Sequence, residues 1–171
     1  ALAQDGDVTA TTFQNWAITG GTGQTAFAID AGTGQITVAD SAQLDRETTD
    51  RFTLLLIVSD GVHTSAAETV TIHLNDLNDV LPVVTPNQEF AVDENTVGGS
   101  VVGTVPATDL DVTATTFQNW TITGGTGQTA FAINAGSGQI TVADSGQLDR
   151  ETVGSLTLDI TVSDGENTSA A

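Results

Sequence analysis

Short acidic motifs recur in this chain at equivalent places in the sequence. They are Asp-x-Asp at 5–7 and 109–111, Leu-Asp-Arg-Glu at 44–47 and 148–151, and Ser-Asp-Gly at 59–61 and 163–165, with single copies of Asp-Glu-Asn at 93–95 and Asn-Asp-Leu-Asn-Asp at 75–79. Aspartate and asparagine hydrogen-bond their own backbone in turns, which explains any one motif taken alone. Taken together they favour a Ca²⁺ site, because calcium takes roughly six to eight hard oxygens from carboxylates, amides, carbonyls and water.

The ligands of such a site must converge from several loops. No stretch follows the spacing of an EF-hand, and the sequence has no glycine-rich nonapeptides of a calcium-binding β-roll. The GGTGQT stretch at 20–25 lacks the lysine and the following helix of a phosphate-binding loop. We therefore expect ligands at the ends of structural elements and no enzyme activity.

The charge of the chain excludes two classes of partner. Asp and Glu number 22 against three Lys and Arg, for a formal net charge of −19. Such a chain lacks the cations that bind nucleic-acid phosphates or anionic membrane surfaces. No apolar run approaches the roughly 18 residues needed to span a bilayer. We expect neither nucleic-acid binding nor membrane insertion, and we expect counter-ions to offset the self-repulsion of the acidic groups.

The sequence contains an internal repeat with an offset of 104 residues. Residues 5–67 align with 109–171 without gaps, and 14 of the 63 aligned positions differ. We expect a window from a longer array. Repeat 1 would span residues 1–79 and lack its first strands, and repeat 2 would span residues 80–171 and lack its last strand.

Alternation of apolar and polar residues predicts β-strands throughout. The clearest runs are LTLDITVS at 156–163 and TVTIHLN at 69–75, whose period of two is that of half-buried strands. Shorter β-rich runs separated by turn signals lie at 99–107, 116–123, 131–133 and 139–143. Roughly seven short strands in about 100 residues predict an all-β, Greek-key sandwich for each repeat. Trp16 and Trp120 fall within strands and are expected in the core.

Residues 52–59 depart from this alternation. Leu55 and Ile57 stand where repeat 2 has Asp159 and Thr161. Either a neighbouring segment covers this face, or the face is a small apolar contact surface.

The acidic motifs, in this order, resemble those of cadherin repeats. DLNDVLP at 76–82 is similar to the DxNDxxP linker of that family, and the other motifs follow in the family's order over essentially the whole chain. The resemblance implies a seven-stranded sandwich per repeat, joined end to end through a calcium-binding linker. The absence of Lys, Cys and Met suggests the bacterial type, as in large surface or secreted adhesins.

The resemblance also implies which residues bind calcium. At the central junction these are Asp45, Glu47, Asp76, Asn78, Asp79, Asp109, Asp111 and Asp164, with the backbone carbonyl of Leu77. Two outer half-sites would consist of Asp5, Asp7 and Asp60, and of Glu94, Asp149 and Glu151. Without the ion these carboxylates would repel one another, and with it the joint between the repeats would stiffen.

The function implied is that of a calcium-dependent structural and adhesive module of an extracellular or cell-surface protein. Its cofactor would be Ca²⁺, and its partners the neighbouring repeats of the same chain. The alternative is a carbohydrate-binding or homophilic recognition module, with like repeats or surface glycans of another cell as partners.

Overall fold

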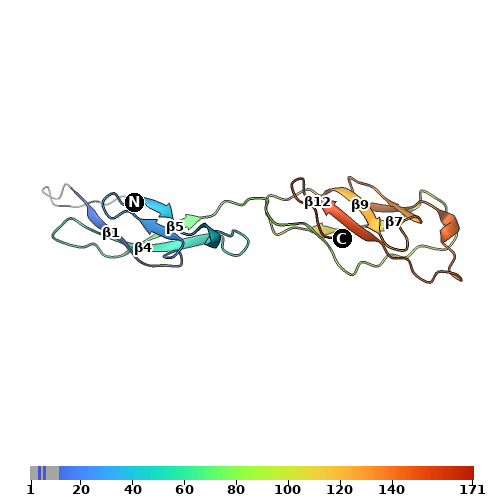
Figure 1. Ribbon diagram of the computed structural model, residues 1–171, viewed down its shortest axis with the longest axis horizontal. Helices are drawn as coiled ribbons and strands as arrows, with labels where there is room; N and C mark the ends of the chain where they lie inside the picture. The colour runs from blue at the N-terminus through green and yellow to red at the C-terminus, as the bar shows by residue number, and fades with distance from the viewer. Residues whose placement is uncertain (1–3, 5, 7–11) are drawn as a thin grey trace. The chain divides into compact units, whose positions relative to one another are not determined.

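The computed structural model describes residues 4, 6 and 12–171, and this described part consists of strands and turns with two short 3₁₀ helices (Figure 1). It divides into two compact units, unit 1 from Ala1 to Asp76 and unit 2 from Leu77 to Ala171. The predicted all-β sandwich is confirmed. None of the described helices is long and apolar enough to cross a membrane. The predicted division into repeats 1–79 and 80–171 stays a prediction.

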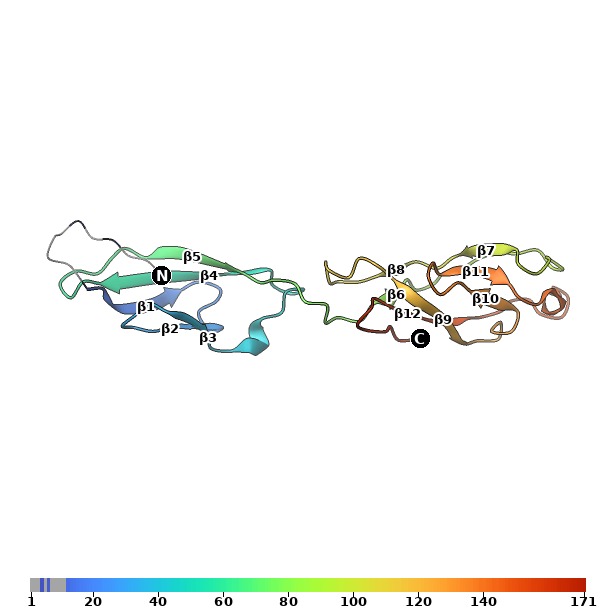
Figure 2. The ribbon, with the colours of Figure 1, turned by 90° about the horizontal axis from the view of Figure 1, so that it is seen from above.

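Unit 1 is built in two layers (Figure 2). One is the antiparallel sheet β1-β4-β5, formed by β1 (Gln14–Gly20), β4 (Arg51–Ser59) and β5 (Glu68–His73). The other pairs β2 (Phe27–Ile29) with β3 (Ile36–Val38), and η1 (Ser41–Gln43) follows it. Between the layers the Phe27 and Phe52 rings meet edge to face with centroids 5.5 Å apart. Leu54 is fully buried beside them.

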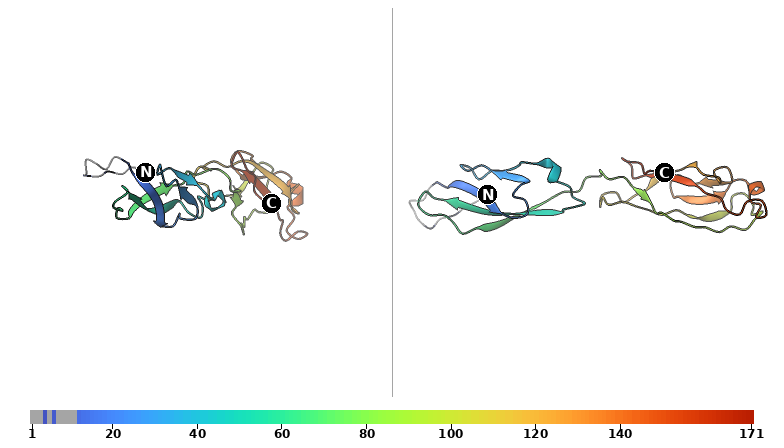
Figure 3. Two further views of the ribbon diagram at one scale, coloured as in Figure 1. Left: turned by 60° about the vertical axis from the view of Figure 1, so that its left-hand side comes forward. Right: turned by 60° about the horizontal axis from the view of Figure 1, so that its bottom comes forward.

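Unit 2 contains three sheets. Figure 3 shows its strands from two further directions. Its elements are β6 (Val83–Val84), β7 (Val101–Thr104), β8 (Ala107–Thr108), β9 (Gln118–Gly124), β10 (Phe131–Ile133), β11 (Gln139–Val142), η2 (Ser145–Gln147) and β12 (Asp159–Ser163). The sheets are β12-β9, β10-β11-β7 and β6-β8, and all the pairs are antiparallel. Val105, Trp120, Ile140 and Val162 form the main core cluster.

Both tryptophans are buried, as predicted, and a backbone irregularity directs them inward. Asn119 in β9 has a φ of 56°, in the left-handed region that asparagine tolerates better than most residues. The next residue, Trp120, then turns into the core. Gly138 lies against its indole, where an added Cβ would be 2.9 Å from Cε2. Asn15 and Trp16 repeat this arrangement in unit 1.

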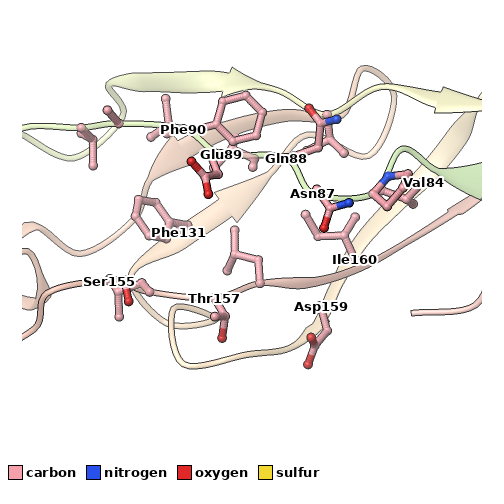
Figure 4. Close-up of a pocket in the computed structure, with 18 of the residues that line it drawn as sticks. Val84, Asn87, Gln88, Glu89, Phe90, Phe131, Ser155, Thr157, Asp159 and Ile160 are labelled. Atoms are coloured by element: carbon pink, nitrogen blue, oxygen red, sulfur yellow. The ribbon is translucent and has the colours of Figure 1, made fainter.

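β12 is shorter than the predicted strand 156–163, because it begins at Asp159. In unit 1 the corresponding strand β4 pairs with both β1 and β5, whereas β12 pairs with β9 alone among the described strands. Residues 156–158 therefore lack the neighbour that extends the ladder in unit 1. Residues 156–158 line a groove of about 1100 Å³, which lies between residues 82–92 and 155–160 (Figure 4).

The apolar pair in β4 is partly exposed. Leu55 is 36% exposed and Ile57 is half-buried, so no described segment of unit 1 covers Leu55 completely. Whether this face is a contact surface stays a prediction.

Candidate metal centre

Three segments of unit 2 meet at one end of its sandwich. Residues 78–80 lead into β6, residues 109–111 follow β8, and Asp164 follows β12. β6 and β8 are antiparallel with Val83 opposite Thr108, so the residues before β6 lie beside the residues after β8. The pairing of these short strands thus brings distant parts of the sequence to one place.

Asp109, Asp111 and Asp164 form a cluster of carboxylates at this end. Each offers an oxygen, and these oxygens lie within 4.8 Å of one another. Asp111 is 3% exposed and Asp164 is 7% exposed. Carboxylates almost never become this buried without a compensating partner. No Lys or Arg in the described part of the chain forms an ion pair with the cluster.

Two oxygens of the cluster have no hydrogen-bond donor. Asp109 Oδ2 and Asp111 Oδ1 are buried and make no hydrogen bond to any described residue. Their partner oxygens are satisfied, because Asp109 Oδ1 accepts from the Asp111 amide at 3.0 Å and Asp111 Oδ2 accepts from the Val80 amide at 2.9 Å. An unsatisfied buried acceptor is costly, and a bound cation removes that cost.

The side-chain amide of Asn78 completes the cluster. The terminal atom that it turns toward the carboxylates lies 3.1 Å from Asp111 Oδ2 and 2.9 Å from Asp164 Oδ2. If this atom is nitrogen, it donates to both carboxylates. If it is Oδ1, three oxygens converge. The first orientation satisfies the amide and both carboxylates without an ion, because each carboxylate then accepts a hydrogen bond.

The turn after β12 keeps Asp164 ionised. Burial raises the pKa of Asp164, but hydrogen bonds from the backbone amides of Asn167 and Glu166 outweigh it and hold the pKa below its ordinary value. Those amides lie 2.7 and 2.8 Å from Asp164 Oδ1. Because Oδ1 is occupied in this way, Oδ2 is the oxygen left to face Asn78 and a cation.

Unit 1 brings together predicted ligands from the Leu-Asp-Arg-Glu motif and from the segment after β5. Glu47 and Asp76 offer carboxylate oxygens within 4.8 Å of each other. Asp45 folds back on Thr48, whose amide and hydroxyl donate to it at 3.0 and 2.9 Å. The Thr48 amide and hydroxyl lower the pKa of Asp45.

The structure describes one of the two predicted outer half-sites completely and the other only at Asp60. Glu94, Asp149 and Glu151 bring oxygens within 4.8 Å of one another, and all three side chains are exposed. Asp149 and Glu151 follow η2, and Glu94 lies between β6 and β7. Asp60 in unit 1 accepts from the amides of Val62 and His63. The two remaining residues of that half-site, Asp5 and Asp7, lie outside the described residues.

Two linker residues are not brought into the unit 2 cluster. The side chain of Leu77 is exposed, and only its backbone carbonyl was predicted to act. Asp79 is also exposed, and it belongs to none of the acidic clusters among the described residues. The predicted ligand roles of both residues stay predictions.

Sequence reasoning missed Asn167. Its amide nitrogen donates to the backbone carbonyls of Asn78 and Val80, at 3.2 Å each, and lies 3.4 Å from Asn78 Oδ1. The one signal available is that the repeats differ at this position, where unit 1 has His63. That difference alone does not indicate a contact 87 residues away in the sequence.

The comparisons with known proteins place part of the chain in a family. Residues 88–171 match the description "Cadherin domain". These residues form a cadherin domain. Human protocadherin Fat 4 is 34% identical over 149 residues, which are 85% of this chain and 3% of that protein. A Caenorhabditis elegans cadherin EGF LAG seven-pass G-type receptor, fmi-1, is 34% identical over 144 residues, which are 82% of this chain and 5% of that protein.

A solved structure shares the fold. The crystal structure of the human desmocollin-1 ectodomain superposes with a TM-score of 0.62 and 28% identity, over 98% of this chain and 34% of that one. The chain thus spans a few per cent of its curated relatives and about a third of this ectodomain. The relatives named here are animal cadherins, and the bacterial type expected from composition stays a prediction.

Proposed function

We propose that the end of unit 2 binds Ca²⁺ and that the chain is a calcium-dependent structural and adhesive module of an extracellular protein. The carrying observation is the cluster of Asp109, Asp111 and Asp164, whose carboxylate oxygens lie within 4.8 Å of one another although two of the three side chains are buried. The donorless oxygens of Asp109 and Asp111 support it. All these groups are hard oxygen ligands, the set that calcium prefers over transition metals.

Within unit 2 the ion would be held by Asp109, Asp111 and Asp164 together with Asn78. Bound calcium would supply positive charge that offsets the repulsion among three carboxylates. Three of their carboxylate oxygens already accept from backbone amides, so these side chains leave four oxygens free, fewer than the roughly six to eight that calcium takes.

We therefore propose that the remaining ligands come from unit 1 and from the linker, as the DxNDxxP motif implies. They would be Asp45, Glu47, Asp76 and Asp79, with the carbonyl of Leu77. In a longer array, Glu94, Asp149 and Glu151 would act in the same way at the next junction, and Asp5, Asp7 and Asp60 at the preceding one. Calcium at each junction would then link successive repeats and stiffen the array.

The adhesive role is supported by the cadherin domain and by its similarity to a protocadherin and to a desmocollin ectodomain. Neighbouring repeats of the same chain would be the first partners, and the location would be extracellular. A carbohydrate-binding or homophilic role is the alternative. A glycan array probed with and without chelator distinguishes them, since reproducible calcium-dependent hits would favour the glycan-binding role.

The test is a thermal melt of the full chain in excess Ca²⁺, in Mg²⁺ and in chelator, with calorimetric titration of Ca²⁺. Ligand at about 100 times its Kd stabilises the folded state by about 2.7 kcal/mol. For a unit of this size that raises Tm by roughly 10–20 °C. Mg²⁺ should raise it far less, because it requires a smaller octahedral site.

Asp111→Asn is the matched variant, because it removes a charge while Oδ1 of the new amide can still accept from the Val80 amide. Its Tm in chelator should equal or exceed that of the wild type, since one repulsive charge is gone, and calcium should no longer raise it. Glu89→Gln removes an exposed charge outside the cluster and should behave as the wild type. Equal melting of the wild type in calcium and in chelator would refute the proposal.

A further inference from the structure

Residues 78–80, which precede β6, are bonded to the rest of unit 2 at three backbone groups. The side-chain NH₂ of Asn167 donates to the backbone carbonyls of Asn78 and Val80, at 3.2 Å each. The backbone amide of Val80 donates to Asp111 Oδ2 at 2.9 Å. The backbone of this short segment is thus held on unit 2 by protein groups alone.

The side chain of Asn78 adds a bridge between two carboxylates. With its NH₂ toward the cluster, it donates to Asp111 Oδ2 at 3.1 Å and to Asp164 Oδ2 at 2.9 Å. In this orientation the other end of the amide, Oδ1, faces only donors, so both ends are satisfied. Hydrogen bonds to ionised acceptors are stronger than those between neutral groups. Because Asp111 and Asp164 are both buried, these two bonds form away from water, where they are stronger still.

The bridging NH₂ does electrostatically part of what a cation would do. Asp109, Asp111 and Asp164 repel one another, and the NH₂ is the positive end of the amide dipole. Placed between two of the three carboxylates, it offsets part of that repulsion without carrying a net charge. The NH₂ and a cation exclude each other, because a cation bound to Asp164 Oδ2 would repel the N–H groups that already occupy this oxygen.

We propose that Asn78 is an amide latch. In the ion-free chain its NH₂ bridges Asp111 and Asp164 and holds the end of the linker on unit 2, and a cation must displace this NH₂ to bind Asp164 Oδ2. The latch itself needs no ion, whereas the identity of the displacing cation as Ca²⁺ rests on the proposed function. On displacement the amide turns over, and Oδ1 takes the place of the NH₂ as a ligand.

The latch predicts which part of the linker is held without an ion. Residues 78–80 would stay on unit 2 in chelator, and the freedom of the ion-free linker would lie before Asn78. The two carbonyl bonds from Asn167 do not involve the Asn78 side chain, so they would keep the segment in place while the Asn78 amide turns.

The first experiment measures amide hydrogen exchange of the full chain in chelator. Asn78→Asp keeps the size of the side chain but sets a fourth carboxylate against Asp111 and Asp164. The control Asn134→Asp makes the same charge change in a turn outside the cluster, where unit 1 naturally has an aspartate. We expect the Val80 amide to exchange at least about tenfold faster in Asn78→Asp than in the wild type, because repulsion replaces two charge-assisted bonds.

The control should leave Val80 exchange unchanged. Equal Val80 exchange in Asn78→Asp and in the wild type would overturn the latch. So would a wild-type Val80 amide that exchanges in chelator as fast as an unstructured peptide.

The second experiment follows the side-chain NH₂ of Asn78 in ¹⁵N-edited spectra during titration with Ca²⁺, with binding measured in parallel by calorimetry. We expect the signals to shift and the NH₂ hydrogens to exchange at least about tenfold faster at saturation, because the group has left the carboxylates. Calcium binding that leaves these signals unchanged would overturn the displacement. If calorimetry detects no calcium binding, the proposed function fails, and Val80 exchange in chelator still decides the latch.

Discussion

At the scale of the residue, the geometry of the candidate site depends on which oxygen of each carboxylate accepts hydrogen bonds from the backbone and which one faces the cluster. Asp164 gives one oxygen to the turn amides and one to the cluster. Asp111 likewise gives one oxygen to the Val80 amide, and its other oxygen has no donor. Backbone amides thus orient each of these two carboxylates without an ion, which would reduce the entropy lost if a cation were coordinated.

Asp30 allows a test of how much such turn carboxylates contribute to stability. Its Oδ1 accepts from the Thr33 hydroxyl and amide and from the Gly32 amide at 2.7–3.0 Å, and these bonds, the hydroxyl first, lower its pKa. In unit 2 the same turn has Asn134, which accepts from two backbone amides. The two repeats therefore carry the charged and the neutral version of one turn.

We expect Asp30→Asn to destabilise unit 1 at pH 7 and to have little effect at acid pH. The folded-state pKa lies below the unfolded value near 3.8, so the ionised form is favoured by folding. Its contribution is complete above the unfolded pKa and is lost as pH falls through the folded pKa. Calorimetric melts in chelator from pH 7 to pH 2.5 measure the difference between wild type and variant. A difference that stays constant over this range would contradict the assignment.

At the scale of the element, β12 shows how a strand depends on its neighbours. Residues 156–158 alternate as well as their counterparts in β4, yet they form no ladder in unit 2. In unit 1, Val70, Ile72 and Leu74, from β5 and the residue after it, pack on the core of Phe27, Phe52, Leu54 and Leu56. The groove beside β12 is the corresponding space in unit 2, and Phe90, Phe131 and Ile160 face it (Figure 4).

Appending a copy of residues 68–79 after Ala171 should therefore stabilise unit 2. Burying three aliphatic side chains contributes roughly 1.5–3 kcal/mol each, before the cost of ordering the added strand. We expect Tm of unit 2 to rise by several degrees. Hydrogen exchange of residues 156–158 should also slow. The control carries serine at the copied positions of Val70, Ile72 and Leu74, and an equal rise in this control would exclude strand addition as the cause.

The sequence was sufficient for features that depend on local pattern. Alternation located β5 and the strand ending at Ser163, and motif order pointed to Asp109, Asp111 and Asp164 as one group. It was insufficient where a partner distant in sequence decides the outcome. The start of β12 depends on the strand beside it, and the role of Asn167 depends on two carbonyls some 90 residues earlier. A bond to a backbone carbonyl places no requirement on the residue type there, so the sequence carries no trace of it.

At the scale of the whole molecule, the charge of −19 is consistent with a chain that takes up cations. Within unit 2, two groups of three acidic side chains each bring carboxylate oxygens within 4.8 Å of one another. Repeats joined in this way would be separated by repulsion without calcium and held together with it. In this proposal calcium would therefore set the stiffness of the joint as well as neutralise its charge.

Small-angle X-ray scattering of the full chain, in millimolar Ca²⁺ and in chelator, tests this claim most directly. In calcium we predict a narrow distribution of maximum dimensions, as expected for a stiff joint. In chelator we predict a broader distribution, as expected for a flexible one, and Asp111→Asn in calcium should resemble the wild type in chelator. Superimposable wild-type profiles under both conditions would contradict the account.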